Sequence, residues 1–302
     1  MSADNQALLS GAIRFLQQLL RVNLFSAISS SLCIALIFIL IYHIIGSLNL
    51  IERIIASLVG SLSIICSQAF DNFSLIAEVY AFQNFLLLIL LVILIKSHSS
   101  ILQTRLRFQY CFAFLYGISL GIHASMAVFI PAFLVYNLVI DQRVLRSKQI
   151  SFILFFSLLG FFVYIFLPLR SLSPLAFDWG DPETLYQFLR QIFDKKDSNK
   201  EIYYLIKFSI FDFMLYINNL IGEFSIILCL VGAVGFLKLL VSKFHIAILL
   251  SSVFFINILF FLNAGWTVSW GYIPSFIIFS IFIDKGKRKN DKRIPNEIKL
   301  SK

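Results

Sequence analysis

Long apolar runs, separated by short polar or charged segments, fill most of this chain. Each run approaches the ~20 residues that a helix needs to cross a ~30 Å hydrocarbon core. Nine membrane-spanning helices are predicted, at residues 22–45, 54–70, 75–95, two within 108–140, 150–167, 221–240, 245–262 and 271–283. The pattern therefore predicts an all-α, polytopic helical membrane protein.

The segment 108–140 needs a separate argument, because it contains no Lys, Arg, Asp or Glu and is too long for one crossing. As a single helix it would extend about 50 Å. Basic residues flank it on both sides, which requires an even number of crossings. Two short helices that meet near residues 117–123 satisfy this requirement, with Pro131 tolerated inside the second helix.

Composition and charge agree with a membrane location. Charged residues make up only 14% of the 302 residues, whereas soluble domains carry about 25%. The net charge of +9 is concentrated after the last apolar run, where eight Lys or Arg residues stand against three acids. A basic tail directly after a span is the positive-inside signal, so we expect a cytoplasmic C-terminus and no nucleic-acid partner.

This topology divides the chain into three parts. Residues 1–21 place Arg14 and Arg21 among apolar residues at roughly helical spacing, which is typical of an amphipathic helix in the membrane interface. Residues 22–283 form the transmembrane domain, with 170–208 as an external loop, and 284–302 form a basic cytoplasmic tail. Because the chain would start outside with no preceding span, we expect that an upstream segment is missing.

Several kinds of chemistry have no signal in the sequence. The four cysteines stand singly inside apolar runs, and no histidine lies at metal-ligand spacing, so no metal site is predicted. Phosphate loops, dinucleotide fingerprints and nucleophile elbows are likewise not found. No cofactor is predicted.

The most distinctive polar residues lie at 167–171 (Leu-Pro-Leu-Arg-Ser) and 177–182 (Phe-Asp-Trp-Gly-Asp-Pro), in the predicted external loop. Arg170 has two interpretations: its side chain reaches lipid headgroups, or its guanidinium binds a substrate phosphate. Asp181 suits the N-cap of a helix that starts at Pro182. Asp178, Trp179 and Asp181 are also candidates for binding a donor or acceptor, and a solvated connector is the alternative.

Two further candidates lie near predicted helix ends. Glu78 is expected in the first turn of a helix, where the helix dipole stabilises a carboxylate. It alternatively holds an acceptor hydroxyl or an arginine at the outer surface. His123 is expected at the apex of the 108–140 hairpin, either as a neutral, hydrogen-bonded imidazole or as a group that meets a phosphate or a sugar hydroxyl.

Five motifs occur in a characteristic order: residues 21–27 (Arg-Val-Asn-Leu-Phe-Ser-Ala), 77–81 (Ala-Glu-Val-Tyr-Ala), 117–123 (Gly-x3-Gly-x-His), 167–171 and 178–182. Residues 272–275 (Tyr-Ile-Pro-Ser) add a sixth segment. Together they resemble a bacterial multi-pass membrane family related to protein O-mannosyltransferases, over about residues 21–283. The resemblance implies a type C glycosyltransferase-like architecture in the bacterial inner membrane. It also implies transfer of a mannose-like sugar from a polyprenyl-phosphate donor to a protein or other acceptor at the outer face.

One part of the family pattern has no counterpart. Members carry, before these motifs, an acidic catalytic segment like Asp-Ser-Gly-Glu and a segment like His-Pro-Pro-Gly-Tyr-Pro, and neither occurs here. The catalytic residue is therefore unassigned, with Glu78 as a candidate, and a fragment of such an enzyme is expected. A non-catalytic membrane remnant or partner subunit is the alternative, and a transporter ranks last because charges at mid-bilayer depth are almost absent from the sequence.

Overall fold

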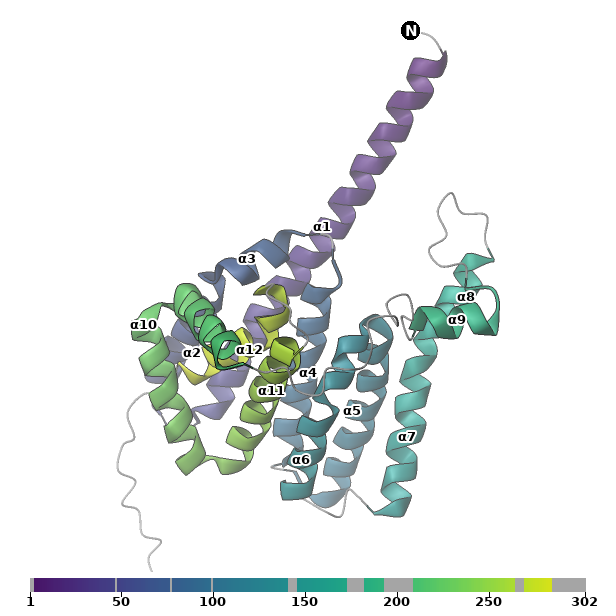
Figure 1. The fold of residues 1–302 in the computed structure, drawn as a ribbon. Coiled ribbons are helices and arrows are strands. Elements are labelled where there is room, and N and C mark those ends of the chain that lie inside the picture. Colours follow the sequence, from purple (N-terminus) through teal and green to yellow (C-terminus); the bar gives the residue numbers. More distant parts are fainter. Residues whose placement is uncertain are drawn as a thin grey trace, which may run out of the picture.

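A computed structural model of the protein describes residues 3–46, 48–76, 78–98, 100–140, 146–172, 182–192, 209–263 and 269–283. Within these ranges the chain is almost entirely helical, and none of the described residues lies in a strand (Figure 1). The predicted all-α fold is confirmed. The predicted tail, 284–302, and residues 173–181 and 193–208 of the predicted loop lie outside the described residues.

The first four helices are α1 (Ala3–Ile44), α2 (Leu50–Ile65), α3 (Gln68–Leu75) and α4 (Tyr80–His98). Both α2 and α4 pack against α1. Although a separate interfacial helix was expected up to residue 21, α1 continues through this position without a break, and its N-terminal part extends beyond the other helices (Figure 1). The interfacial location of residues 1–21 stays a prediction.

The 108–140 segment forms the expected pair of helices. Helix α5 (Leu102–Ile122) is followed by the 3-10 helix η1 (Ala124–Phe129) and by α6 (Ile130–Ile140). His123, with φ −152° and ψ 124°, is extended and breaks the helix between α5 and η1. The Tyr116 hydroxyl donates to the Met126 carbonyl at 2.7 Å and ties the two arms together. The sequence placed Pro131 inside the second helix, and it lies in the first turn of α6.

The second half of the chain contains two groups of helices. Helix α7 (Ser147–Phe161) continues through η3 (Phe162–Ile165) into α8 (Phe166–Ser171), and α9 (Leu185–Ile192) is short. Helix α10 (Ile210–Ser242) is kinked at Ser225, and α11 (Phe244–Asn263), η5 (Ser269–Tyr272) and α12 (Ile273–Phe282) follow.

The number of membrane spans differs from the prediction. Five described helical segments are long and apolar enough to cross a membrane: Leu20–Ile44, Tyr80–His98, Lys148–Ser171, Ile210–Ser242 and Phe244–Asn263. A sixth results if α2 and α3, bent by 70°, form one broken span. The count of nine is therefore not confirmed. Arg105, Arg107 and Gln109 lower the hydropathy of α5, and Ala124–Val139 and Ile273–Phe282 are short.

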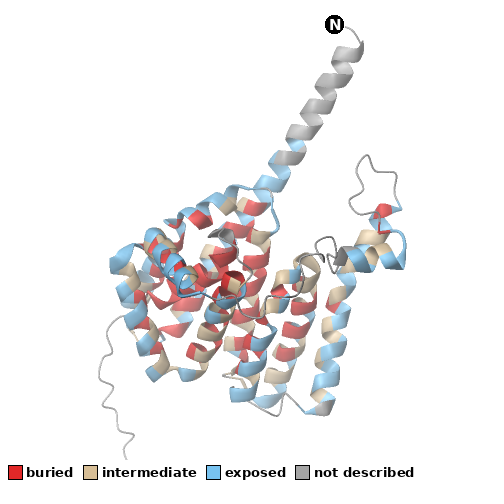
Figure 2. Ribbon diagram, in the orientation of Figure 1, coloured by how far each residue is buried: buried red, intermediate tan, exposed pale blue. Residues whose placement is uncertain are grey.

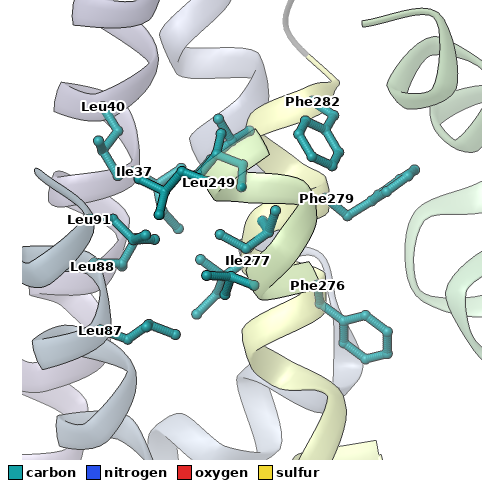
Figure 3. Packing of buried hydrophobic residues seen from close by; sticks show 14 of the residues in the cluster. Ile37, Leu40, Leu87, Leu88, Leu91, Leu249, Phe276, Ile277, Phe279 and Phe282 are labelled. Atoms are coloured by element: carbon teal, nitrogen blue, oxygen red, sulfur yellow. The ribbon is translucent and has the colours of Figure 1, made fainter. Parts of the chain in front are cut away.

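The buried residues concentrate where α1, α4, α11 and α12 meet, whereas α7 is largely exposed (Figure 2). Figure 3 shows Ile37 of α1, Leu88 of α4, Leu249 of α11 and Ile277 of α12 packed together. All four side chains are fully buried. Leucine, isoleucine and phenylalanine make up most of the buried cluster.

Charged residues divide between the two ends of the helix bundle. At one end, the basic end, lie Arg53, Lys96, Arg105, Lys148, Lys238 and Lys243, most of them near the ends of their helices. At the other, the acidic end, lie Asp71, Glu78, Glu183, Asp212 and Glu223, together with Arg21, Arg170 and Arg190. Since consecutive helices alternate in direction, a charged residue near a helix end lies at one of these two ends of the bundle.

Two glycines bring α5 and α7 into close contact. A Cβ atom at Gly117 would collide with the Ser157 carbonyl oxygen, and one at Gly160 would collide with the Phe114 carbonyl oxygen. Small residues allow helix backbones to approach in this way inside a membrane. Gly121 is less restricted, because its Cβ would collide only with the Val163 side chain. Close backbone packing therefore explains Gly117 of the 117–123 motif.

Gly117→Ala and Gly160→Ala should each destabilise the protein by about 1–3 kcal/mol, because the added methyl group must push the backbones of α5 and α7 apart. Thermal unfolding in detergent measures this loss. Gly222→Ala is the matched control, since no atom lies within 4 Å of its Cβ position. Equal melting temperatures for Gly117→Ala and Gly222→Ala would contradict the close helix contact.

Candidate functional site

Glu78 lies at the acidic end, but not in a helix. The sequence predicted it in the first turn of a helix, whereas α4 begins only at Tyr80. The Glu78 amide donates to the Ile76 carbonyl at 2.8 Å, and its own carbonyl accepts from the Ser26 hydroxyl at 3.2 Å. These backbone contacts fix a turn before α4 and leave the Glu78 side chain exposed. The helix dipole of α4 therefore does not explain the position of Glu78.

His123 is oriented by a chain of hydrogen bonds. Its Nδ1 accepts from the Ser125 amide at 3.2 Å and lies 2.8 Å from the Ser125 hydroxyl oxygen. Gln83 of α4 donates from Nε2 to that same oxygen at 2.8 Å. Because Nδ1 already accepts a proton from the backbone and the Ser125 oxygen accepts one from Gln83, the hydroxyl donates to Nδ1. The imidazole proton is thus assigned to Nε2.

The surroundings keep the His123 ring neutral. Burial lowers the pKa of His123 below its usual value, and the Tyr80 ring lies 5.1 Å from the imidazole, centroid to centroid. Among the described residues, Nε2 has no hydrogen-bond partner. A neutral imidazole with its proton on Nε2 donates a hydrogen bond from that atom. Both interpretations of His123 from the sequence therefore apply. Its Nδ1 is bonded within the hairpin, and its Nε2–H is available to a ligand.

A small polar cavity adjoins this chain of hydrogen bonds. It has a volume of about 10 Å³ and is lined in part by Tyr80, Gln83, Asn84 and Ser125. Gln83 Oε1 and Asn84 Oδ1 have no hydrogen-bond partner in the described part of the chain, although their side chains are only 5% and 4% exposed. A cavity of this size holds one hydroxyl group or water molecule. Buried acceptors without donors are costly, so the cavity favours a group that donates hydrogen bonds.

The opposite wall of the cavity is held by polar residues of α11 and α12. Asn257 donates to the Gly271 carbonyl at 3.1 Å and accepts from the Ser275 amide at 3.3 Å. The Ser275 hydroxyl donates to the Tyr272 carbonyl at 2.7 Å and accepts from the Tyr216 hydroxyl at 3.0 Å. The Tyr-Ile-Pro-Ser segment at 272–275 therefore fixes the turn into α12.

Glu223 makes a further contact at the acidic end. Its carboxylate accepts from the Ser67 hydroxyl at 2.8 Å and from the Ala69 amide at 3.1 Å, at the start of α3. Ser225, two residues later, has φ 63° and is the one non-glycine residue with positive φ in the described part of the chain. Glu223 thus joins α10 to α3 next to the kink of α10.

The other sequence candidates are only partly placed. Arg170 is exposed on α8, and the structure brings no described candidate residue into contact with it. Asp178, Trp179 and Asp181 lie outside the described residues. The helix expected from Pro182 begins at Leu185, where the Thr184 hydroxyl accepts from the Gln187 amide at 3.2 Å. Thr184 therefore caps α9 in the position that was assigned to Asp181.

Sequence reasoning missed Gln83, Asn84, Ser125 and Asn257. A signal did exist for the first two, because they are adjacent amides at the start of an otherwise apolar helix. Polar residues within a membrane-spanning segment are costly and commonly functional. Ser125 gave no comparable signal, since its role depends on the contact between η1 and α4.

Ser125→Ala should raise the pKa of His123, because the variant removes the hydroxyl that donates to Nδ1 and stabilises the neutral ring. NMR titration of ¹³C-labelled histidine in micelles measures this pKa. Ser119→Ala is the matched control, since its buried hydroxyl donates to the Tyr116 carbonyl and does not contact His123. An unchanged His123 pKa in Ser125→Ala would refute the hydrogen-bond assignment.

Comparison with known proteins gives a family match that includes part of this site. Residues 6–146 match the family model described as the protein O-mannosyl-transferase TMEM260 N-terminal domain. No curated protein and no solved structure matches the chain. The match includes the motifs at 21–27, 77–81 and 117–123, and with them Glu78, Gln83 and His123. The predicted resemblance is therefore confirmed: residues 6–146 are similar to the protein O-mannosyl-transferase TMEM260 N-terminal domain.

Proposed function

We propose that this protein is a membrane glycosyltransferase of the O-mannosyltransferase kind. It transfers a mannose-like sugar from a polyprenyl-phosphate donor to a protein or other acceptor. The observation that carries the proposal is the match of residues 6–146 to the TMEM260 domain. That matched segment contains His123, whose Nε2–H is oriented by Ser125 and Gln83.

The chemistry of transfer requires stabilisation of the departing phosphate. In our proposal, the Nε2–H of His123 donates to a phosphate oxygen of the donor. A neutral donor suits this role because it keeps its proton while the negative charge on the phosphate increases. Arg170 is a second candidate, since a guanidinium pairs with phosphate oxygens in a bidentate manner. Asp178, Trp179 and Asp181 are proposed to complete the donor or acceptor site.

The acceptor hydroxyl requires a general base. Glu78 is our candidate, because its exposed carboxylate lies at the same end of the bundle as His123 and two residues before Tyr80, whose ring packs on His123. The adjacent cavity supports a sugar substrate. Its two unpaired amide oxygens, on Gln83 and Asn84, are suited to accept a hydrogen bond from one hydroxyl group.

We further propose that the acidic end faces the outside of a plasma membrane. The basic end contains Arg53, Lys96, Arg105, Lys148 and Lys243. Clusters of Lys and Arg favour the cytoplasmic side of a membrane. A donor and acceptor would then meet outside the cell. This orientation leaves the C-terminal tail in the cytoplasm.

Purified protein in nanodiscs should bind radiolabelled polyprenyl-phosphate mannose saturably, and His123→Ala should weaken this binding about 10–100-fold. A hydrogen bond to a charged group contributes about 1.5–3 kcal/mol, which corresponds to that range. His43→Ala is the control, because this exposed histidine lies in the last turn of α1, whereas Ser26, which contacts Glu78, lies in the middle of that helix.

A serine- and threonine-containing peptide added to the same nanodiscs tests transfer. Label on the peptide supports the glycosyltransferase proposal. Binding of the donor without transfer would favour the alternative, a non-catalytic partner subunit. Absence of both binding and transfer, in protein that remains folded, would contradict both.

A single cysteine at position 124 should react with an impermeant thiol reagent added outside intact cells, whereas one at position 242 should react only after permeabilisation. Both positions are exposed, and they lie at opposite ends of the bundle. The four native cysteines are first replaced by alanine, because Cys66 and Cys111 are exposed. The reverse labelling pattern would invert the proposed orientation.

A further inference from the structure

A large apolar groove runs along α10, α11 and α12, apart from the site at His123. Its volume is about 460 Å³, within the ~300–1,000 Å³ typical of ligand sites. Its wall includes Phe213 and Phe236 of α10, Phe255 of α11 and Phe279 of α12. In Figure 3, Phe279 points away from Leu88 and Leu91 of α4, so it is not part of that side of the core.

The groove spans the kink in α10. Ser225 has φ 63° and ψ 156°, which bends the helix, and the Glu223 carboxylate holds the preceding turn to the start of α3. Beyond the kink, α10 returns to close packing, since a Cβ at Gly232 would lie 2.6 Å from the Phe279 ring. Residues on both sides of the bend, from Phe213 to Phe236, therefore line one apolar space.

The groove lies at the depth of the bilayer hydrocarbon. Its long walls belong to Ile210–Ser242 and Phe244–Asn263, two of the segments that are long and apolar enough to span a membrane. Its rim is open to the outside of the helix bundle, because Ile226 and Leu230 are 60% and 66% exposed. An occupant must therefore be a hydrocarbon chain that enters from the bilayer.

The two ends of the groove differ in charge. At one end, Asp212 and Glu223 lie on α10 close to the wall residues Phe213 and Ile221. Asp212 lies in the first turn of α10, where its carboxylate accepts from the amide and the hydroxyl of Ser209. A phosphate group at the acidic end would be repelled by both carboxylates.

At the other end, Lys238 lies just before the last turn of α10, and Lys243 begins the connection to α11. Burial and the nearby Arg53 lower the pKa of Lys243. Glu52 is the one acidic residue at this end of the described chain, and its carboxylate is bonded to the Asn49 amide at 3.4 Å. Cations thus outnumber acids here, and an anion would stabilise them.

We propose that the groove binds one acyl chain of an anionic phospholipid, whose headgroup phosphate lies at Lys238 and Lys243. The apolar wall, its bilayer depth and the charge at its basic end together select this occupant. A polyprenyl-phosphate donor bound at His123 would instead place its phosphate at the acidic end. The phospholipid site is therefore distinct from the donor site, and it does not depend on the proposed function.

Native mass spectrometry of the detergent-purified full chain tests this site with added phosphatidylglycerol, phosphatidylcholine or polyprenyl phosphate. Phosphatidylglycerol should bind with the highest affinity. Ala233→Phe places a ring in the groove and should abolish this binding, because Ala233 lines the wall. Val234→Phe is the matched control: it adds the same ring at the next position, which is exposed and outside the wall, and should bind normally.

Removal of positive charge tests the headgroup position. Lys238→Gln and Lys243→Gln should each weaken phosphatidylglycerol binding about five-fold, since a Lys near an anionic headgroup contributes ~1 kcal/mol. Lys148→Gln, at the same end but on α7, should have no effect. Melting in lipid-free detergent confirms that every variant is folded.

Three results would overturn the proposal. Phosphatidylglycerol binding that survives in folded Ala233→Phe would place the lipid elsewhere. Equal binding of phosphatidylcholine, unaffected by Lys238→Gln and Lys243→Gln, would show that the headgroup charge is not recognised. Binding of polyprenyl phosphate alone, abolished by Ala233→Phe, would identify the groove as part of the donor site.

Discussion

A bilayer supplies no hydrogen-bond partners, so each polar group between the helices of this protein must be satisfied by the chain itself. The Tyr116 hydroxyl bonds to the Met126 carbonyl across the α5–η1 break, and the Tyr136 hydroxyl bonds to the Leu94 carbonyl. Asn257 uses both amide atoms to hold the turn into α12. Against this background, the unpaired amide oxygens of Gln83 and Asn84 are conspicuous. They lie beside the chain of hydrogen bonds that orients His123, which is why we place the candidate site there.

The helix break at His123 connects fold and function. An extended residue between α5 and η1 turns the chain back and directs the imidazole toward Tyr80 at the start of α4. The close contact of Gly117 with α7 fixes α5 on its other side. The position of His123 therefore follows from packing, whereas its tautomer follows from Ser125 and Gln83. This division separates the residues that hold the hairpin in place from those that determine its chemistry.

The sequence predicted the features that depend on local pattern. Apolar runs gave the helices, and the basic flanks of 108–140 gave the hairpin with His123 at its apex. It failed where a contact between distant segments contributes, as in the bond of Ser26 to the Glu78 carbonyl and the bond between Glu223 and α3 beside the kink at Ser225. It also assigned the cap of α9 to Asp181 and not to Thr184, although that cap is a local contact with Gln187. Gln83 gave a signal as an amide in an apolar helix, but its partner Ser125 could be found only from the structure.

The central claim is that His123 presents a neutral Nε2–H to the phosphate of a lipid-linked sugar. The ¹⁵N chemical shifts of His123, recorded with and without polyprenyl-phosphate mannose in nanodiscs, test it most directly. The account predicts a protonated Nε2 and an unprotonated Nδ1 before addition. It further predicts that the donor changes the Nε2 shift and leaves Nδ1 bonded to Ser125. A protonated Nδ1 in the free protein, or an Nε2 shift that the donor leaves unchanged, would contradict the account.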